Sequence, residues 1–225
     1  MENLNIAVSV WKDPDWTSND VVKFIKPYIY PNKIGHAGTL DPFAKGVLVL
    51  CIGKMTKEVS NIMKSEKEYL VKISLGKRTD TLDCTGDITN IKKYIFKSDK
   101  KVKVILKDFE GIIDQIPPMF SALKFNGTRL YTLARAGIII PREPRKINIK
   151  KITLIRNNKR SIVISVRCGK GTYIRALARD IANRLGTEGF VIDLTRTKVG
   201  NFNKNNSINC KDFKNWLIYQ KISQI

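Results

Sequence analysis

The chain has 225 residues, of which 43% are hydrophobic and 27% are charged, so it can bury a core without disulfides or metals. It carries 41 lysines and arginines against 20 acidic residues, and this net charge of +21 predicts a polyanionic partner. The single histidine, His36, leaves little material for zinc sites or serine–histidine catalysis.

Two further classes of protein are excluded by the cysteines and the apolar runs. The four cysteines lie more than 30 residues apart and form no CxxC pair, which is typical of reduced thiols in a cytoplasmic protein. Apolar runs such as 47–52 are far too short to cross a membrane. The first residues lack the basic segment of a signal peptide. We therefore expect a cytoplasmic location without membrane association.

Apolar periodicity and turn residues predict helices and strands along the whole chain. In the first half we expect a strand over 6–11, a helix from Thr17-Ser18 to about Tyr28, a glycine-rich loop over 33–46, strands over 47–52 and 68–75, and a helix from Ser98 to Gly111. In the second half we expect a short helix over 129–136 and a hairpin of 147–156 and 161–168 around Asn157-Asn158. A helix capped by Thr172 and ended by Gly186 follows, and a closing helical segment covers 203–225. The run 47–52 is apolar throughout, as in a strand buried on both faces.

The order of these elements predicts the fold class. Helices and strands alternate irregularly and are joined by hairpin signals rather than by strict β-α-β units. We therefore expect one α+β domain over 1–225, with a mixed, largely antiparallel central sheet and flanking helices. Within it, residues 115–140 form a long segment marked by proline and glycine.

Positive charge is concentrated in the second half of the chain. Residues 1–114 hold 19 basic and 15 acidic side chains, whereas residues 115–225 hold 22 basic and 5 acidic ones and 11 of the 12 arginines. A coding bias toward lysine would not sort arginine by position. The asymmetry therefore favours a nucleic-acid surface built mainly by the second half.

The loop GHAGTLDPFAKG, Gly35–Gly46, is the strongest local candidate for a site. Its glycines permit close backbone approach, and Asp41-Pro42 fixes a turn that presents one carboxylate. Such a turn is more often only a turn, so the functional interpretation depends on motifs elsewhere in the chain.

Five segments in order strongly resemble motifs of the tRNA pseudouridine-55 synthases, the TruB family. They are GHAGTLDPFAKGVL from Gly35, KEYLVKISLGKRTDTLDCTGD from Lys67, QIPPMFSALKFNGTRLYTLARAG from Gln115, GKGTYIRALARDIANRLG from Gly169 and LTRTKVGNF from Leu194. The first resembles the family's catalytic motif, the third its RNA-binding insertion and the fourth its late arginine motif.

The resemblance implies an isomerase that flips the T-loop uridine (position 55) out of its stack and converts it to pseudouridine. It implies Asp41 as the nucleophile, Tyr69 stacked against the flipped base and Arg175 paired with the nucleophile. Asp41 acts either on the ring or at the sugar, and Tyr69 is also a candidate to take the ring-carbon proton. The reaction needs no redox step, group donor, cofactor or metal.

The resemblance also implies contacts with RNA and a solitary mode of action. Cations for phosphates and rings for unstacked bases are interleaved in the insertion. The RNA-binding candidates are His36, Asp80, Lys124, Arg129, Tyr131 and Arg135, and Arg142, Arg145, Lys146, Lys150 and Lys151 extend the charge. We expect the T-arm of tRNA as the partner, a monomer and no obligate protein partner.

The chain departs from the family pattern in a few places. The opening KDPDWTS, from Lys12, has Asp15 where the family pattern Lys-Pro-x-Gly-x-Thr-Ser has glycine, so its turn is expected to differ. Phe120 stands where tyrosine is frequent. After Asn203 we expect no full C-terminal domain of the PUA type, so tRNA affinity would depend on the basic second half.

Three other functions are weighed against this one. The first is an RNA-binding protein without catalysis, although binding alone does not require a carboxylate in an RNA-facing loop. The second is a related synthase that depends on a guide RNA and partner proteins. The third is a metal-dependent nuclease that uses Asp80, Asp83 and Asp87, although their spacing is not that of a calcium loop.

Overall fold

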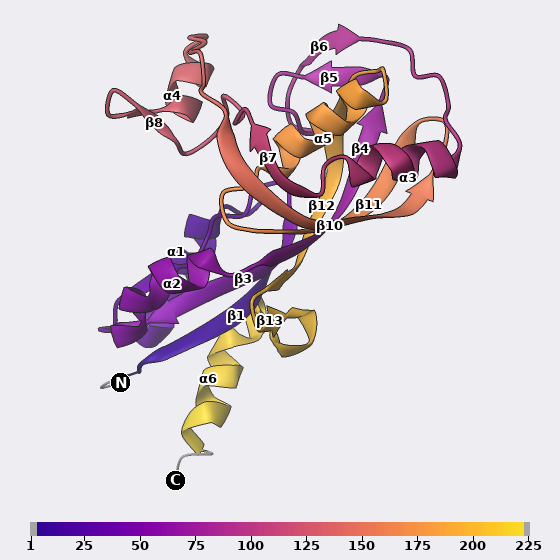
Figure 1. Cartoon of the computed structure of the whole chain (residues 1–225). Helices are drawn as coiled ribbons and strands as arrows, with labels where there is room; N and C mark the ends of the chain where they lie inside the picture. The colour runs from indigo at the N-terminus through magenta and orange to yellow at the C-terminus, as the bar shows by residue number, and fades with distance from the viewer. Residues whose placement is uncertain (1–3, 223–225) are drawn as a thin grey trace. The chain divides into compact units, whose positions relative to one another are not determined.

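The computed structural model describes residues 4–222, which form two compact units (Figure 1). The first unit contains the chain up to Tyr69 and again from Leu194 onward, and the second contains Leu70–Asp193. Strands β4 (Lys67–Leu75) and β12 (Gly189–Val199) are neighbours, and each runs from one unit into the other. The expectation of one catalytic domain over 1–225 stays a prediction.

The first unit is built from short strands and helices around the β1–β3 pair. Its elements are β1 (Ile6–Lys12), α1 (Ser18–Ile29), β2 (Ile34–His36), β3 (Lys45–Ile52), a 3-10 turn (Gly53–Glu58), α2 (Val59–Lys64), β13 (Phe202–Asn203), β14 (Ile208–Asn209), 3-10 turns at Lys204–Asn206 and Cys210–Asp212, and α6 (Phe213–Ile222). Its strand order is β14-β1-β3-β12. Strands β1 and β3 are antiparallel, whereas β14 and β12 join them in parallel.

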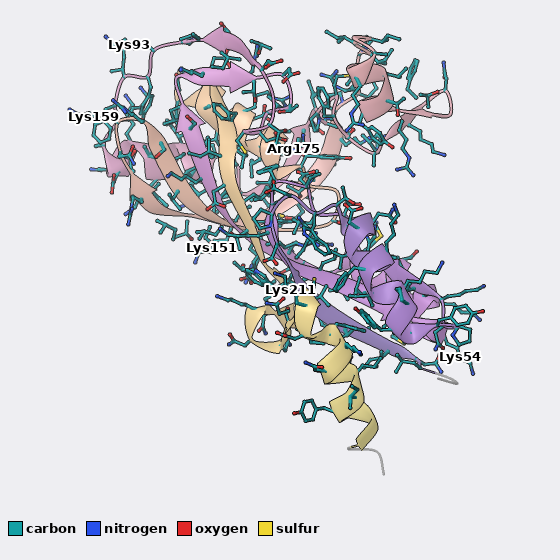
Figure 2. The ribbon with its side chains drawn as sticks, turned by 180° about the vertical axis from the view of Figure 1, so that it is seen from behind. Lys54, Lys93, Lys151, Lys159, Arg175 and Lys211 are labelled. Atoms are coloured by element: carbon teal, nitrogen blue, oxygen red, sulfur yellow. The ribbon has the colours of Figure 1, made fainter. Side chains whose placement is uncertain are left out.

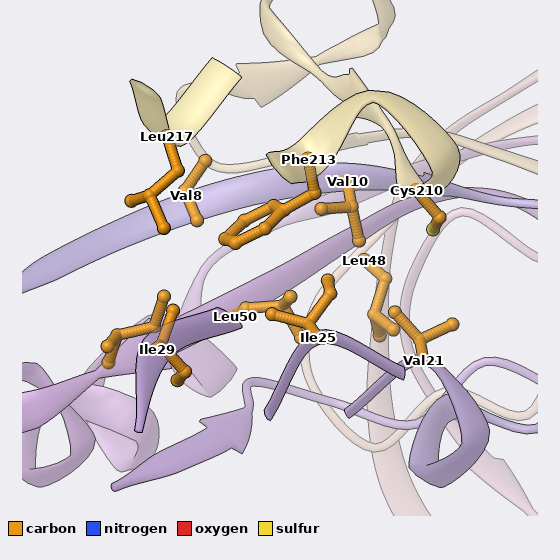
Figure 3. Close-up of a cluster of buried hydrophobic side chains, with 11 residues drawn as sticks. Val8, Val10, Val21, Ile25, Ile29, Leu48, Leu50, Cys210, Phe213 and Leu217 are labelled. Atoms are coloured by element: carbon orange, nitrogen blue, oxygen red, sulfur yellow. The ribbon is translucent and has the colours of Figure 1, made fainter. Parts of the chain in front are cut away.

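Both faces of β3 are covered, as its uninterrupted apolar run predicts. On one face, Leu48 and Leu50 pack with Ile25 of α1 and Phe213 of α6 (Figure 3). On the other face, Val47, Val49 and Cys51 pack in a second cluster with side chains of α2. Helix α1 begins where predicted, because Thr17 and Asp20 form a reciprocal capping box. This packing fixes β3 and therefore the end of the loop that carries Asp41.

The second unit holds a strand order of β4-β11-β10-β7, with helices packed on it. Its other elements are β5 (Lys77–Thr79), β6 (Ile88–Ile91), α3 (Asp99–Lys107), β7 (Gly111–Gln115), β8 (Lys124–Phe125), β9 (Thr128–Arg129), α4 (Leu130–Arg135), β10 (Arg145–Asn157), β11 (Ser161–Cys168) and α5 (Ile174–Arg184). Strands β10 and β11 form the predicted antiparallel hairpin, and β7 pairs antiparallel with β10. Together with the pairings of the first unit, they confirm the α+β class with a mixed, largely antiparallel sheet.

Helix α5 confirms the predicted apolar face but corrects its cap. Ile174, Leu177 and Ile181 are buried on one side of the helix. The predicted cap at Thr172 is wrong, because the helix is preceded by Tyr173 and the Thr172 hydroxyl donates to the Gly169 carbonyl. The Tyr173 amide donates instead to the Gln115 side chain, at 2.9 Å, so a residue 58 positions away satisfies the helix start.

Two other expectations need correction. The loop predicted over 33–46 contains the short strand Ile34–His36, which pairs antiparallel with β3. The segment Leu194–Phe202, treated only as a motif, contributes most of its length to strand β12. In both cases the conformation depends on pairing with a neighbouring strand, and local residue preferences do not predict that pairing. No helix within residues 4–222 is both long and apolar enough to cross a membrane.

Candidate active site

The turn that carries Asp41 is fixed through its backbone. Ser18, buried at the start of α1, donates from its hydroxyl to the Leu40 carbonyl at 3.2 Å and accepts from the Leu40 amide at 2.9 Å. The Pro42 carbonyl accepts from the Asp15 amide at 2.8 Å. The peptide groups on both sides of Asp41 are therefore bound to the segment that leads into α1. The Asp41 side chain itself is half-buried.

Lys12 is a buried cation beside this turn. Its side chain is fully buried, and its Nζ donates to the carbonyls of Trp16 at 2.6 Å, of Asp13 at 2.9 Å and of Pro42 at 3.0 Å. Burial lowers the pKa of Lys12 to about 8, and the negative charge of Asp41 opposes this shift. At neutral pH Lys12 is therefore mostly protonated, and it binds the residue that follows Asp41.

The departure from the family pattern at Asp15 is visible in its backbone. Asp15 has a φ of 67°, in the left-handed region that favours glycine. Aspartate enters this region more readily than most residues, so the turn forms without the glycine. The altered opening segment still reaches the Asp41 loop through the hydrogen bond from the Asp15 amide.

His36 lies at the end of β2, on the N-terminal side of Asp41. Its Nδ1 is buried and has no hydrogen-bond partner among the described residues. Burial lowers the pKa of His36, and the positive charge of Arg196 lowers it further. His36 is therefore a neutral ring at pH 7, a form suited to stacking. Tyr69 lies in β4 and is buried, at 8% exposure.

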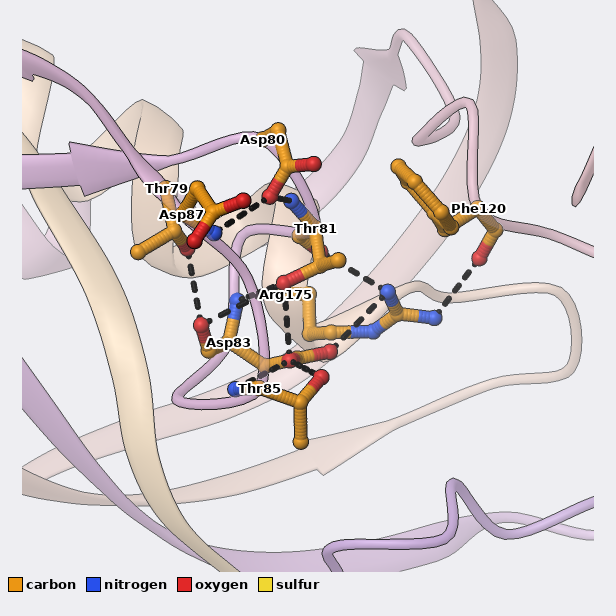
Figure 4. Close-up of polar contacts among 8 residues, drawn as sticks. All are labelled: Thr79, Asp80, Thr81, Asp83, Thr85, Asp87, Phe120 and Arg175. Atoms are coloured by element: carbon orange, nitrogen blue, oxygen red, sulfur yellow. Dashed lines mark hydrogen bonds and ion pairs between the residues drawn. The ribbon is translucent and has the colours of Figure 1, made fainter. Parts of the chain in front are cut away.

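In the second unit, Arg175 is held at the start of α5 by a carboxylate and two carbonyls (Figure 4). Its Nη1 lies 3.2 Å from Asp83 Oδ2 and donates to the Thr81 carbonyl at 2.8 Å. Its Nη2 donates to the Phe120 carbonyl at 2.8 Å. Arg175 is only 6% exposed, which confirms that it does not lie on the solvent face of the helix. One guanidinium thus joins the 79–87 loop to the insertion.

Asp83 is the best-bound carboxylate of the 79–87 loop. Its Oδ1 accepts from the hydroxyls of Thr81, at 2.8 Å, and Thr85, at 2.6 Å, and from the Thr85 amide at 3.0 Å. Its two oxygens therefore receive four charged or polar donors, and this is the pattern that makes a buried carboxylate tolerable. Among the functions weighed from the sequence, Asp83 was considered only for the nuclease alternative, and its pairing with Arg175 was not predicted.

Asp80 shapes the same loop from its surface. Its Oδ1 accepts from the amides of Thr81, at 2.8 Å, and Asp87, at 2.9 Å, and the side chain is exposed. Within residues 4–222, no group of three or more His, Cys, Asp or Glu side chains could hold a metal ion. The carboxylate of Asp83, one of the residues weighed for a nuclease, is occupied by an arginine and two threonines.

The structure brings four of the predicted RNA-binding residues together on the insertion. Strands β8 and β9 pair Lys124 with Arg129. The guanidinium carbons of Arg129 and Arg135 lie 5.9 and 5.6 Å from the centre of the Tyr131 ring. Lys124, Arg129 and Arg135 are exposed and the two arginines lie near one half-buried ring, a combination suited to phosphates and an unstacked base.

The further basic residues differ in how available they are. Arg142 is engaged, because its guanidinium donates to the carbonyls of Pro117 and Ile140, both at 2.9 Å. Lys151 of β10 and Lys159 of the following turn are exposed, and their side chains point outward (Figure 2). Arg142 therefore supports the base of the insertion, whereas the lysines extend a solvated surface.

The candidate residues are divided between the units. Asp41, Tyr69 and His36 belong to the first unit, and Arg175 belongs to the second with the insertion. The pairing of the Asp41 carboxylate with Arg175 stays a prediction. Sequence reasoning also missed Lys12 and Ser18 as supports, although both lie in the KDPDWTS segment that it compared with the family pattern.

Comparisons with known proteins match most of the chain to one family. Residues 26–174 match the N-terminal domain model of the TruB family pseudouridylate synthases, and residues 175–224 match the C-terminal domain model of tRNA pseudouridylate synthase B. The tRNA pseudouridine synthase B of Clostridium tetani is 46% identical over 209 residues, which is 93% of this chain and 72% of that protein. The corresponding protein of Francisella philomiragia is 42% identical over 224 residues, covering 99% of this chain and 74% of that protein.

A solved structure gives the same result at the level of the fold. A chain in the crystal structure of a Cbf5-Nop10-Gar1 complex superposes with a TM-score of 0.73 and 29% identity, over 97% of this chain. This chain spans 56% of the length of that one. The chain therefore belongs to the TruB family of pseudouridylate synthases. It is an isomerase that acts on uridine in RNA.

We expect Asp83→Asn to lower the free energy of unfolding by about 3 kcal/mol, because it removes the buried carboxylate that binds Arg175. Urea denaturation measures this loss. The control is Asp87→Asn, which neutralises an exposed carboxylate of the same loop and should change stability by less than about 0.5 kcal/mol. Equal effects of the two variants would contradict the structural importance of the pair.

We expect the single-turnover rate of the enzyme to fall as the pH rises through about 8, where Lys12 loses the charge that faces Asp41. Above that pH the rate should drop by up to about tenfold per pH unit. The variant Lys12→Met should be slow at every pH and lack this alkaline limb. If Lys12→Met kept an alkaline limb at the same pH, the limb would belong to another group. Circular dichroism checks that the variant is folded.

Proposed function

We propose that this chain isomerises uridine 55 in the T loop of tRNA to pseudouridine, with Asp41 as the nucleophile. The carrying observation is the Asp41 turn in a strongly basic protein, where the buried cation Lys12 binds the carbonyl of the next residue, Pro42. Relatives covered over 72–76% of their length and named tRNA pseudouridine synthase B support tRNA as the substrate.

The proposed reaction is balanced without any added reagent. The bond between uracil N1 and the ribose C1′ breaks, and a bond between uracil C5 and C1′ forms. The proton on C5 leaves and N1 ends with one, so the sum of atoms is unchanged and no cofactor or metal is needed. A carboxylate nucleophile divides the exchange into two easier steps. It acts either on the ring or at the sugar.

We assign the other residues by the properties of their surroundings. Buried Tyr69 offers an aromatic face to the flipped base, and neutral His36 offers a second ring near it. Arg175, oriented by Asp83 and by two carbonyls, keeps a planar guanidinium available to pair with the nucleophile. The T-arm is bound by Lys124, Arg129, Tyr131 and Arg135. Asp80 stabilises the 79–87 loop.

We also propose that the chain acts as a monomer in the cytoplasm and without protein partners. The alternative within the family is suggested by the solved relative, whose structure is a complex with Nop10 and Gar1. The insertion with its own cations and ring supports autonomous RNA binding. Activity of the purified chain alone distinguishes the two modes.

The test follows tritium release from unmodified tRNA labelled at carbon 5 of uracil, in the presence of EDTA and with the purified chain alone. We expect release by the unaltered protein and a loss of more than about 10⁴-fold in Asp41→Asn, because the nucleophile is gone. Binding of tRNA should persist in that variant. The matched control Asp212→Asn, at an exposed carboxylate of the same unit, should release tritium normally. Tight binding without release by any form would instead favour the RNA-binding protein.

A second prediction concerns the insertion. Replacing Lys124, Arg129 and Arg135 together by glutamine should weaken tRNA binding and reduce the salt slope of log K by roughly 2, because up to three phosphate contacts are lost. The matched control removes the same charge from exposed lysines of the first unit, Lys54, Lys57 and Lys64. Binding titrations over a range of salt measure both slopes. An unchanged slope in the insertion variant would mean that the RNA-binding surface lies elsewhere.

A further inference from the structure

Arg196, in the middle of β12, is one of the two largest fully buried side chains of the described residues, at 1% exposure. Its Nε donates to the Val47 carbonyl at 2.8 Å, its Nη1 to the Thr39 carbonyl at 3.1 Å and its Nη2 to the Gly38 carbonyl at 3.1 Å. All three nitrogens of the guanidinium are thus used, each on a different peptide oxygen. Arg196 and these three residues belong to the first unit.

The three acceptors lie on the two ends of the Asp41 loop. Gly38 and Thr39 precede Asp41, whereas Val47 follows it in β3. One planar group therefore ties residues 38–39 to residue 47 and closes the segment between them. A lysine can also bind three carbonyls, as Lys12 does, but only where they converge on its one nitrogen, whereas the three nitrogens of a guanidinium reach acceptors that lie apart.

The main chain of Arg196 is fixed against the same loop. Arg196 pairs with Gly46 in the parallel ladder between β12 and β3. Gly46 has a φ of 123°, and a Cβ there would collide with the carbonyl oxygen of Arg196. The backbone of β12 thus touches the end of the loop while the side chain reaches back to its start, so the guanidinium has little freedom to move.

The remaining carbonyls beside Asp41 are held by other groups. Ser18 binds the peptide of Leu40, and Lys12 binds the carbonyl of Pro42. Arg196 binds the carbonyls of Gly38 and Thr39, which precede these residues. Burying a cation with carbonyls as its hydrogen-bond partners is costly for a protein, and a neutral residue could fill the same space. We therefore attribute the buried arginine to a requirement that the two ends of the loop keep fixed positions.

We propose that Arg196 is a positioning residue for the isomerisation: it clamps the two ends of the 38–47 loop and so fixes the backbone that carries Asp41. This inference rests on the proposed function of Asp41. Arg196 does not touch the substrate in this proposal. It acts through the geometry of the nucleophile, where a misplacement of about 1 Å can cost a hundredfold in rate.

The test compares Arg196→Lys and Arg196→Ala in the full chain with Val199→Ala, which truncates a fully buried apolar side chain of the same strand, packed with Ala37 and Val47, but removes no hydrogen bond from the loop. We expect the single-turnover rate of tritium release to fall about tenfold in Arg196→Lys and about a hundredfold in Arg196→Ala, with the Kd for tRNA changed by less than about threefold. Val199→Ala should lower the melting temperature and leave the rate unchanged. Ethylguanidinium should raise the rate of Arg196→Ala, and ethylammonium should not.

Three outcomes would overturn the proposal. Folded Arg196 variants could react at the wild-type rate. Their loss of rate could match that of Val199→Ala at equal loss of melting temperature, without a response to ethylguanidinium. Both variants could fail to fold, which would make Arg196 a requirement of folding alone. The proposed function fails separately, if Asp41→Asn releases tritium normally. Loss of activity in Asp41→Asn together with normal Arg196 variants would reject only the clamp.

Discussion

The backbone around Asp41 must satisfy its carbonyl groups inside the protein, and it does so largely through buried cations. Lys12 and Arg196 together bind the carbonyls of residues 38, 39, 42 and 47. Hydrogen bonds to charged donors are stronger than those between neutral groups, and these donors also bring positive charge close to the proposed nucleophile. The same contacts therefore give the loop its shape and its electrostatic surroundings.

The second unit also buries a cation, but here a carboxylate balances its charge. Arg175 is held by the carboxylate of Asp83 as well as by two carbonyls, so its charge is balanced where it is buried. The carboxylate is in turn bound by Thr81 and Thr85, which keeps the ion pair in one arrangement. The guanidinium that the proposed mechanism requires is consequently oriented before any substrate arrives, which is what makes electrostatic assistance effective.

The sequence predicts the elements that depend on local patterns and misses those that depend on pairing. The apolar run 47–52 and the stripe of Ile174, Leu177 and Ile181 are set by burial, and both are confirmed. Strand Ile34–His36 exists because it lies beside β3, and nothing in its own three residues indicates this. The α5 start is satisfied by Gln115, a partner too distant in sequence for any capping rule.

The same limit applies to the site. Motif resemblance selects Asp41, Tyr69 and Arg175, because their residue types carry the chemistry. The supports were missed, because a lysine or an arginine that binds carbonyls has no characteristic spacing. Only the structure shows that Arg196 is buried in a strand, between the buried Thr195 and Val199, where a charged side chain is costly without a structural role.

The contact between Arg175 and residue 120 uses the main-chain oxygen of Phe120 and leaves its ring uninvolved. Every amino acid offers the same oxygen, so the identity of the side chain at this point is not constrained by the arginine. A family in which tyrosine is frequent here can therefore accept phenylalanine without disturbing the anchored guanidinium. The side chain at position 120 can therefore change in chemistry while the main-chain attachment of the insertion to α5 is kept.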